Sequence, residues 1–302
     1  MPERSRRHCS IKRGVKEGAH GGTTGSPVLT PVEPDPGNAG EGRSLIPRCL
    51  TIAGSDSGGG AGIQADLKAF AAAGCFGMSA IVALTAQNTA GVTSVHEAPP
   101  EFVRDELESV FSDLGVDAAK TGMLFSREII AAVAEFLSDH PVPLVVDPVM
   151  IASSGARLLQ EDAVETLVSR LFPLATVVTP NLPEARALAD AEGDQRELAE
   201  RLHELGAPAV VVTGGHAEEP VDWLFDGERH VEIPVECHDT PATHGAGCTH
   251  SATLAARLAQ GDDLESAARA AAEAASAAVA HGLTELGAGE GPVDVLNLKG
   301  AP

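Results

Sequence analysis

The pattern of hydrophobic and polar residues changes at about residue 49. From there on, short continuous apolar runs alternate with segments whose apolar residues recur every three or four positions. The runs predict strands over 49–53, 78–84, 118–120, 144–147, 176–179 and 209–213. The segments predict helices over 100–114, 127–138, 161–171, 183–190 and 195–205. Apolar strands that alternate with helices are typical of a mostly parallel sheet covered on both faces, so we expect an α/β fold.

Both ends of the chain depart from this alternation. Two short apolar segments, 223–225 and 230–235, flank the turn Asp226-Gly227 and predict an edge hairpin. Two alanine-rich helices are expected over 246–259 and 263–281. Residues 1–44 are rich in Gly and Pro and lack periodicity, which predicts a disordered extension ahead of one domain over 45–302.

Charge narrows the classes of function. The net charge is −22, and seven of the 21 Lys and Arg residues but only five of the 43 Asp and Glu residues lie in 1–44. Residues 45–302 therefore hold 14 basic and 38 acidic residues, a net charge of −24. Such a body repels nucleic acid and anionic membranes, so neither is an expected partner. Self-repulsion weakens in concentrated salt, which suggests a salt-rich, haloarchaeon-like source; the alternative is an ordinary acidic protein.

Cysteine usage and hydropathy indicate a reducing compartment. The five cysteines form no CxxC pair and no disulfide framework. The sequence has neither the apolar run of a signal peptide nor an apolar stretch of about 18 residues that would span a membrane. We expect a cytoplasmic protein.

Polar and small residues follow most of the predicted strands. Because ligands bind beyond the carboxyl ends of parallel strands, these residues predict one site along one sheet edge. The first such segment, 54–62, is rich in glycine but matches neither a P-loop nor a dinucleotide fingerprint. It predicts a loop where backbone approaches a ligand, and Asp66 lies one turn into the following helix.

The segment 243–250 is the best candidate for binding phosphate. Gly245, Ala246 and Gly247 precede an alanine-rich helix, whose first amides and dipole attract anions. Cys248 lies in that field, which favours a lowered thiol pKa. A zinc site made by the Cys and His residues of 237–250 is disfavoured, because their spacing fits no zinc motif.

Three further sets of residues could contact a ligand. Asn181 and Glu184 lie one turn apart and could orient Mg²⁺ near phosphates, or simply cap a helix. Gln87 offers an acceptor beside a donor, which pairs with a ring nitrogen next to an exocyclic amine. Met123 and Val149 end strands and could enclose a flat ring, although core packing is their ordinary role.

These residues belong to short motifs in a specific order. They are Thr51–Asp56 with 58–68, Ala86-Gln87-Asn88-Thr89, Lys120-Thr121-Gly122-Met123-Leu124, Asp147-Pro148-Val149-Met150, 179–185, Gly214-Gly215-His216, Asp222-Trp223-Leu224, 244–249 and 289–293. Together they resemble the hydroxymethylpyrimidine/phosphomethylpyrimidine kinases of thiamine biosynthesis, in the ribokinase-like superfamily. The resemblance runs from about Cys49 to Asn297.

The resemblance implies a three-layer ribokinase-like fold and an enzyme that uses ATP and Mg²⁺. It would phosphorylate 4-amino-5-hydroxymethyl-2-methylpyrimidine and then the resulting monophosphate, as a homodimer. The matching positions assign Gln87, Gly54, Ala61, Asp66, Met123 and Val149 to the pyrimidine. They assign Gly245, Ala246, Gly247 and the catalytic Cys248 to an anion hole, Asn181, Glu184, Thr213 and Gly215 to the nucleotide, and Glu184 to Mg²⁺.

The chain departs from the family pattern at two positions. Thr213 stands where the family usually has Lys, and Ala246 stands where it usually has Thr. The alternatives are a pyridoxal kinase of the same fold, which Gln87 argues against, and a non-catalytic pyrimidine sensor, which the loss of Lys at position 213 suggests.

Overall fold

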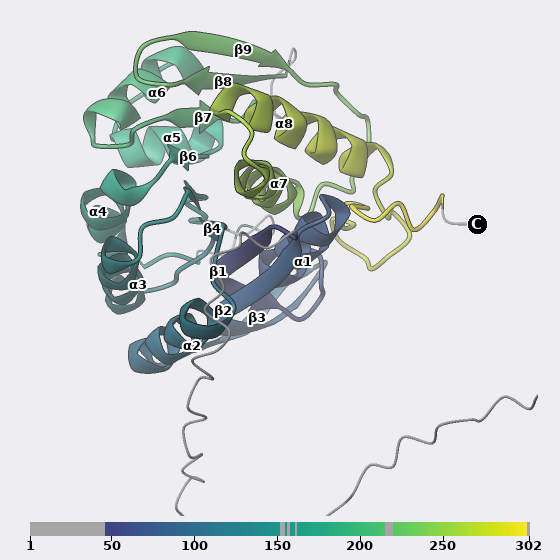
Figure 1. The fold of residues 1–302 in the computed structure, drawn as a ribbon. Helices are drawn as coiled ribbons and strands as arrows, with labels where there is room; N and C mark the ends of the chain where they lie inside the picture. The colour runs from purple at the N-terminus through teal and green to yellow at the C-terminus, as the bar shows by residue number, and fades with distance from the viewer. Residues whose placement is uncertain (1–45, 152–154, 156–157, 161, 215–219, 301–302) are drawn as a thin grey trace, which may run out of the picture. The chain divides into compact units, whose positions relative to one another are not determined.

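The computed structural model describes residues 46–151, 155, 158–160, 162–214 and 220–300. Their centre is a sheet with the strand order β3-β2-β1-β4-β5-β6-β7-β8-β9 (Figure 1). The strands are β1 (Arg48–Asp56), β2 (Phe76–Asn88), β3 (Gly91–Glu97), β4 (Ala118–Thr121), β5 (Leu144–Val146), β6 (Val177–Val178), β7 (Val210–Val212), β8 (Val221–Phe225) and β9 (His230–Pro234). The expected extension over 1–44 and Gly215 lie outside the described residues.

The pairing follows the predicted topology. Strands β2, β1, β4, β5, β6 and β7 are parallel, and β8 and β9 form the expected antiparallel hairpin at one edge. Strand β3 pairs antiparallel with β2 at the other edge. The sequence pattern did not predict β3, because an edge strand with no fully buried residue carries little apolar alternation.

Helices cover both faces of the sheet, as Figure 1 shows. On one face lie α1 (Gly62–Ala72), α7 (Ala246–Gln260) and α8 (Leu264–Ala280). On the other lie α2 (Pro100–Asp113), α3 (Arg127–Asp139), α4 (Ala163–Thr166), α5 (Leu182–Ala189) and α6 (Gln195–Glu204). Neighbouring strand residues point to opposite layers: Leu50 packs in the second layer and Cys49 in the first. The three-layer α/β prediction is confirmed.

One predicted helix has a different form. The helix expected over 161–171 is α-helical only over Ala163–Thr166. It continues as a π-helix over Leu167–Leu171 and a 3₁₀ turn over Phe172–Leu174. Apolar spacing alone does not distinguish these three helix types, since they differ only in which carbonyl each amide reaches.

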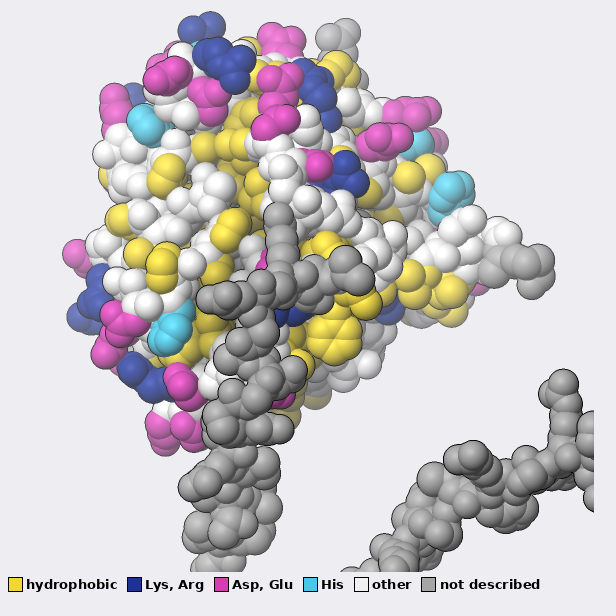
Figure 2. Space-filling model, viewed as in Figure 1, with side chains coloured by type: hydrophobic (Ala, Val, Ile, Leu, Met, Phe, Trp, Pro, Cys, Tyr) yellow, Lys and Arg dark blue, Asp and Glu magenta, His cyan; other side chains and the backbone are white. Residues whose placement is uncertain are grey.

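Most charged side chains lie on the surface, and a few, among them Asp66 and Lys120, are buried between the layers. On the face shown in Figure 2, acidic and basic side chains lie around the edge, and hydrophobic and uncharged side chains occupy the middle. None of the described helices is both long and apolar enough to span a bilayer.

The excess of surface acid predicts that salt stabilises the fold. Between 0.1 M and 2 M KCl, screening should raise the thermal unfolding midpoint by at least about 2–4 °C, the shift that 1 kcal/mol produces in a domain of this size. Scanning calorimetry in a KCl series measures it. A midpoint that does not change with salt contradicts a fold adapted to salt.

Candidate functional site

A cavity of about 570 Å³ lies at the carboxyl ends of the parallel strands, in front of the start of α7. It brings together most of the residues that the sequence analysis selected. Those that line it are Gly54, Ala61, Gln87, Met123, Val149, Asn181, Glu184, Thr213, Gly245, Ala246, Gly247 and Cys248. The expectation of one site along one sheet edge therefore matches the position of this cavity.

The glycine-rich loop after β1 is folded around the buried carboxylate of Asp56. The Gly58 amide donates to Oδ1 at 2.7 Å, and the amides of Gly60 and Ala61 donate to Oδ2 at 3.1 and 2.9 Å. His244 Nε2 lies 3.0 Å from the same oxygen. Burial alone would raise the pKa of Asp56, but the hydrogen bonds from His244, Ala61 and Gly58 lower it. Asp56 thus fixes the loop and joins it to the segment that precedes α7.

Asp66 does not lie at the cavity wall, contrary to the expectation. Its side chain is fully buried, accepts a hydrogen bond from the Thr51 hydroxyl at 2.6 Å and lies 2.9 Å from the ammonium of Lys120. Its place at the start of a helix after a glycine-rich loop suggested a ligand contact, but the helix turns this face toward β1 and β4. Asp66 holds Lys120 instead.

Lys120 is fully buried, and its Nζ also lies 3.4 Å from Asp147 Oδ2. The Ser251 hydroxyl of α7 donates to the same oxygen at 2.7 Å. Burial alone would lower the pKa of Lys120, but the carboxylates of Asp66 and Asp147 raise it, so the ammonium stays charged. Sequence reasoning gave no role to Lys120 or Asp147, although a lysine inside an otherwise apolar strand is a signal that a buried partner exists.

The start of α7 has the form of an anion site. Gly245 has φ +90°, and a Cβ there would collide with the carbonyl oxygen of Gly60, so only glycine fits. No side chain caps this helix, and the space beside Gly247 is open. Its first turn therefore presents amide N–H groups and the positive end of the helix dipole to the cavity. The Ala246 amide already donates a hydrogen bond to the Thr243 carbonyl at 3.1 Å, so it is not among the free donors of this turn.

The expected low pKa of Cys248 is wrong for this structure. Burial raises the pKa of the thiol to about 12, with Lys120 opposing and Asp66 and Asp147 adding to the rise. A motif shows the helix terminus but not the protein atoms and acids that surround the sulfur, and here desolvation outweighs the dipole.

Asn181 and Glu184 form both parts of a capping box at the start of α5. The Glu184 amide donates to Asn181 Oδ1 at 2.8 Å, and the Asn181 amide donates to Glu184 Oε2 at 3.0 Å. Burial and the nearby Asp147 raise the pKa of Glu184 to about 8. Two close carboxylates and an amide oxygen are hard donors of the kind that Mg²⁺ prefers. Within the described residues no group of three or more His, Cys, Asp or Glu side chains forms a metal site by itself.

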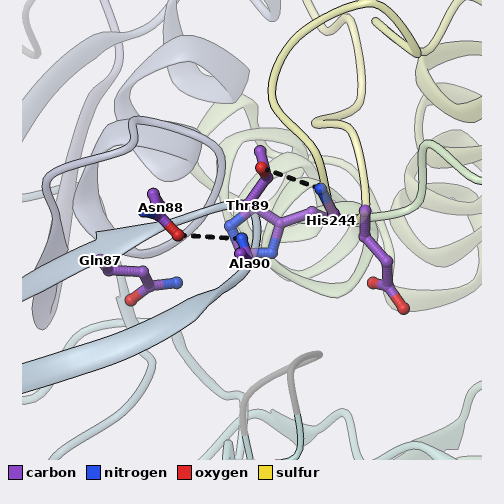
Figure 3. Close-up of a pocket in the computed structure, with 7 residues that line it drawn as sticks. Gln87, Asn88, Thr89, Ala90 and His244 are labelled. Atoms are coloured by element: carbon purple, nitrogen blue, oxygen red, sulfur yellow. Dashed lines mark hydrogen bonds between the residues drawn. The ribbon is translucent and has the colours of Figure 1, made fainter.

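Gln87 stands at the rim between the large cavity and a smaller pocket of about 180 Å³. Figure 3 shows this pocket, with the hairpin residues Asn88, Thr89 and Ala90 near His244. The Thr85 hydroxyl lies 3.0 Å from Gln87 Oε1 and 2.8 Å from the Ser55 carbonyl, so Nε2 of Gln87 and the second lone pair of Oε1 are left for a ligand.

Comparison with known proteins agrees with this architecture. A family model described as phosphomethylpyrimidine kinase matches residues 56–294. The hydroxymethylpyrimidine/phosphomethylpyrimidine kinase of Haemophilus influenzae is 48% identical over 263 residues, which cover 83% of this chain and 97% of that protein. A thiamine biosynthesis bifunctional protein of Geobacter sulfurreducens is 50% identical over 261 residues, but this chain spans only 53% of its length.

Solved structures have the same fold. A phosphomethylpyrimidine kinase from Clostridium difficile is 40% identical, with a TM-score of 0.67 over 75% of this chain and 96% of that chain. A pyridoxal kinase from Bacillus subtilis, in an ADP complex, is 39% identical, with a TM-score of 0.78 over 84% of this chain and 99% of that chain. The extent of these matches, together with the cavity and its anion site, means that the chain belongs to the phosphomethylpyrimidine kinase family.

Proposed function

We propose that this chain transfers the γ-phosphoryl group of ATP to the hydroxymethyl group of 4-amino-5-hydroxymethyl-2-methylpyrimidine, and then phosphorylates the monophosphate. One observation carries the proposal. The side-chain amide of Gln87 and the uncapped start of α7 with Cys248 open into the same 570 Å³ cavity. A side chain that can hydrogen-bond to a ring and a helix start that can bind phosphate thus line the same cavity.

The Gln87 side of the cavity suits a flat aminopyrimidine. The free edge of the amide can accept from the exocyclic amine and donate to the neighbouring ring nitrogen. Met123 and Val149 supply apolar walls for the ring. Gly54 has a steric role, because a Cβ there would collide with the methyl carbon of Met123.

The α7 side suits the transferring phosphoryl group. The amides of Gly245, Gly247 and Cys248 in the first turn would hold its oxygens, where charge stabilisation contributes most to phosphoryl transfer. Glu184 and Asp147 would hold Mg²⁺, which supplies positive charge to the phosphates. Since two carboxylates leave most of its coordination open, phosphate oxygens and water would complete it.

The Cys248 thiol is protonated at neutral pH, because burial raises its pKa to about 12. It would orient the attacking oxygen by a hydrogen bond rather than act as a ready thiolate. In a loose transition state the nucleophile needs little activation, so orientation contributes more than early removal of the proton.

Two finer features complete the proposal. We place the chain in the cytoplasm, because the buried thiols of Cys49 and Cys75 are free, as is usual in a reducing compartment. We infer a homodimer from the family resemblance. Leu84, half exposed on β2 next to the edge strand β3, is an apolar group that a second copy would cover.

Pyridoxal is the second candidate substrate, favoured by the likeness to the Bacillus subtilis pyridoxal kinase. The pyridine ring of pyridoxal has a nitrogen but no amine on the neighbouring carbon. Gln87 therefore favours the pyrimidine.

The substrate is tested by coupled ADP release with hydroxymethylpyrimidine, its monophosphate and pyridoxal. We expect release with both pyrimidines. Gln87→Leu should raise the KM for the pyrimidine at least about tenfold while the ATP affinity stays the same, because the amide contact to the ring is lost. Release with pyridoxal only would reverse the order of the two candidates. Release with none would favour a sensor.

The role of Cys248 is tested by Cys248→Ala. Turnover should fall about a hundredfold or more, and the substrate KM should change little, because the contact acts on the reacting oxygen. Steady-state kinetics separates the two effects, and Cys75→Ala, which removes a thiol outside the cavity, is the matched control. Unchanged turnover in Cys248→Ala refutes the assignment.

A further inference from the structure

The cavity is poor in cations for a site that binds polyphosphate. The acidic side chains among its described lining residues are Asp56, Asp147, Glu184, Asp222, Glu236 and Glu290. Lys120 is the one Lys or Arg among the same residues, and it is fully buried between Asp66 and Asp147. The amides of α7 and Mg²⁺ would offset only part of the repulsion between these acids and the phosphates. The nucleotide therefore needs further hydrogen-bond donors.

Three histidines line the cavity, and two of them already have side-chain partners. His244 Nε2 lies 3.0 Å from Asp56, and His238 Nε2 lies 2.9 Å from the Ser276 hydroxyl. His250 differs. It is 4% exposed, and neither of its ring nitrogens makes a well-formed hydrogen bond within the described part of the chain. A buried imidazole at a cavity wall with an unpaired ring nitrogen is a group that a ligand would satisfy.

His250 is nonetheless held in place by a carboxylate. Its Nε2 lies 3.2 Å from Asp222 Oδ2, at the start of β8, and the other oxygen of Asp222 accepts from the Gly214 amide at 2.9 Å. This acid orients the ring and leaves the Nδ1 edge without a partner.

The pair lies next to the turn that carries the proposed Mg²⁺ ligand. The Thr213 amide donates to the Pro180 carbonyl at 2.9 Å, and Thr213 forms a β-bridge with Asn181. Gly214, which Asp222 holds, follows directly in the chain. Members of the family that this chain resembles usually have a lysine at position 213. With Thr213 in its place, this part of the cavity has no positively charged side chain from that position.

We propose that His250, as an imidazolium with Nε2–H toward Asp222, donates its Nδ1–H to the phosphate chain of the bound nucleotide and takes the place of the lysine that Thr213 replaces. The inference rests on the proposed function, since it requires ATP in this cavity. An imidazole N–H is a hydrogen-bond donor with a fixed direction. The threonine at 213 has only a hydroxyl donor, on a side chain much shorter than that of lysine.

Calorimetric titration with adenosine, AMP, ADP and ATP in the presence of Mg²⁺ tests the proposal. His250→Phe keeps the ring volume and removes both nitrogens. We expect ATP to bind about tenfold more weakly or worse, because a hydrogen bond to a charged group is lost, and adenosine to bind as before. Thr213→Lys added to this variant should restore most of the ATP affinity. His140→Phe, a histidine stacked on Phe136 outside the cavity, is the matched control.

Binding of the pyrimidine substrate shows whether each variant is folded. If His250→Phe is not folded, His250→Gln, which keeps one N–H donor, and His250→Leu, which keeps none, replace it; the glutamine should bind ATP more tightly than the leucine. Equal ATP affinity with and without a donor at 250 overturns the proposal, as does an equal loss for adenosine, which would place the contact on the nucleoside. Failure of the unmodified chain to bind any nucleotide would contradict the proposed function, and the inference with it.

Discussion

The site depends on one buried interaction, the ammonium of Lys120 between the carboxylates of Asp66 and Asp147. Lys120 belongs to β4, Asp66 to α1, and Asp147 follows β5, so one charge joins three elements at the cavity floor. Ser251 extends the contact to α7 through its hydrogen bond to Asp147. A buried charge without partners is far more costly than a buried pair, so these elements are held at one spacing. The anion-binding end of α7 is thereby placed opposite the strand ends.

This arrangement explains how an acidic protein can accept phosphates. The chain as a whole carries a net charge of −22, and the one buried lysine at the cavity is offset by two acids. Attraction must therefore come from short-range groups: the amides at the start of α7, the divalent cation and an oriented imidazole. Such groups act over a few ångströms and lose little to the field of the surface, which water and salt screen.

The sequence predicted which residues line the cavity better than it predicted their contacts and protonation states. Gln87, Glu184 and Cys248 line one cavity, as expected, because the strand-end rule depends only on the order of strands and helices. Asp66 was misplaced and the pKa of Cys248 was given the wrong direction, because both depend on which side chains lie behind the wall. Contacts between distant segments determine the surroundings of Cys248 and the partner of Asp66. A short sequence motif contains no information on such contacts.

The most direct measurement of the central claim is the unfolding free energy of Lys120→Met beside that of the double variant Lys120→Met with Asp66→Leu. Removing only the lysine leaves buried acids without their cation, so denaturant titration should show a loss of about 3–5 kcal/mol. The double variant should recover a large part of that loss, because one of the stranded charges is gone. If Lys120→Met alone stays within about 0.5 kcal/mol of the unmodified chain, a spread typical of surface substitutions, the ion pair does not hold the site together.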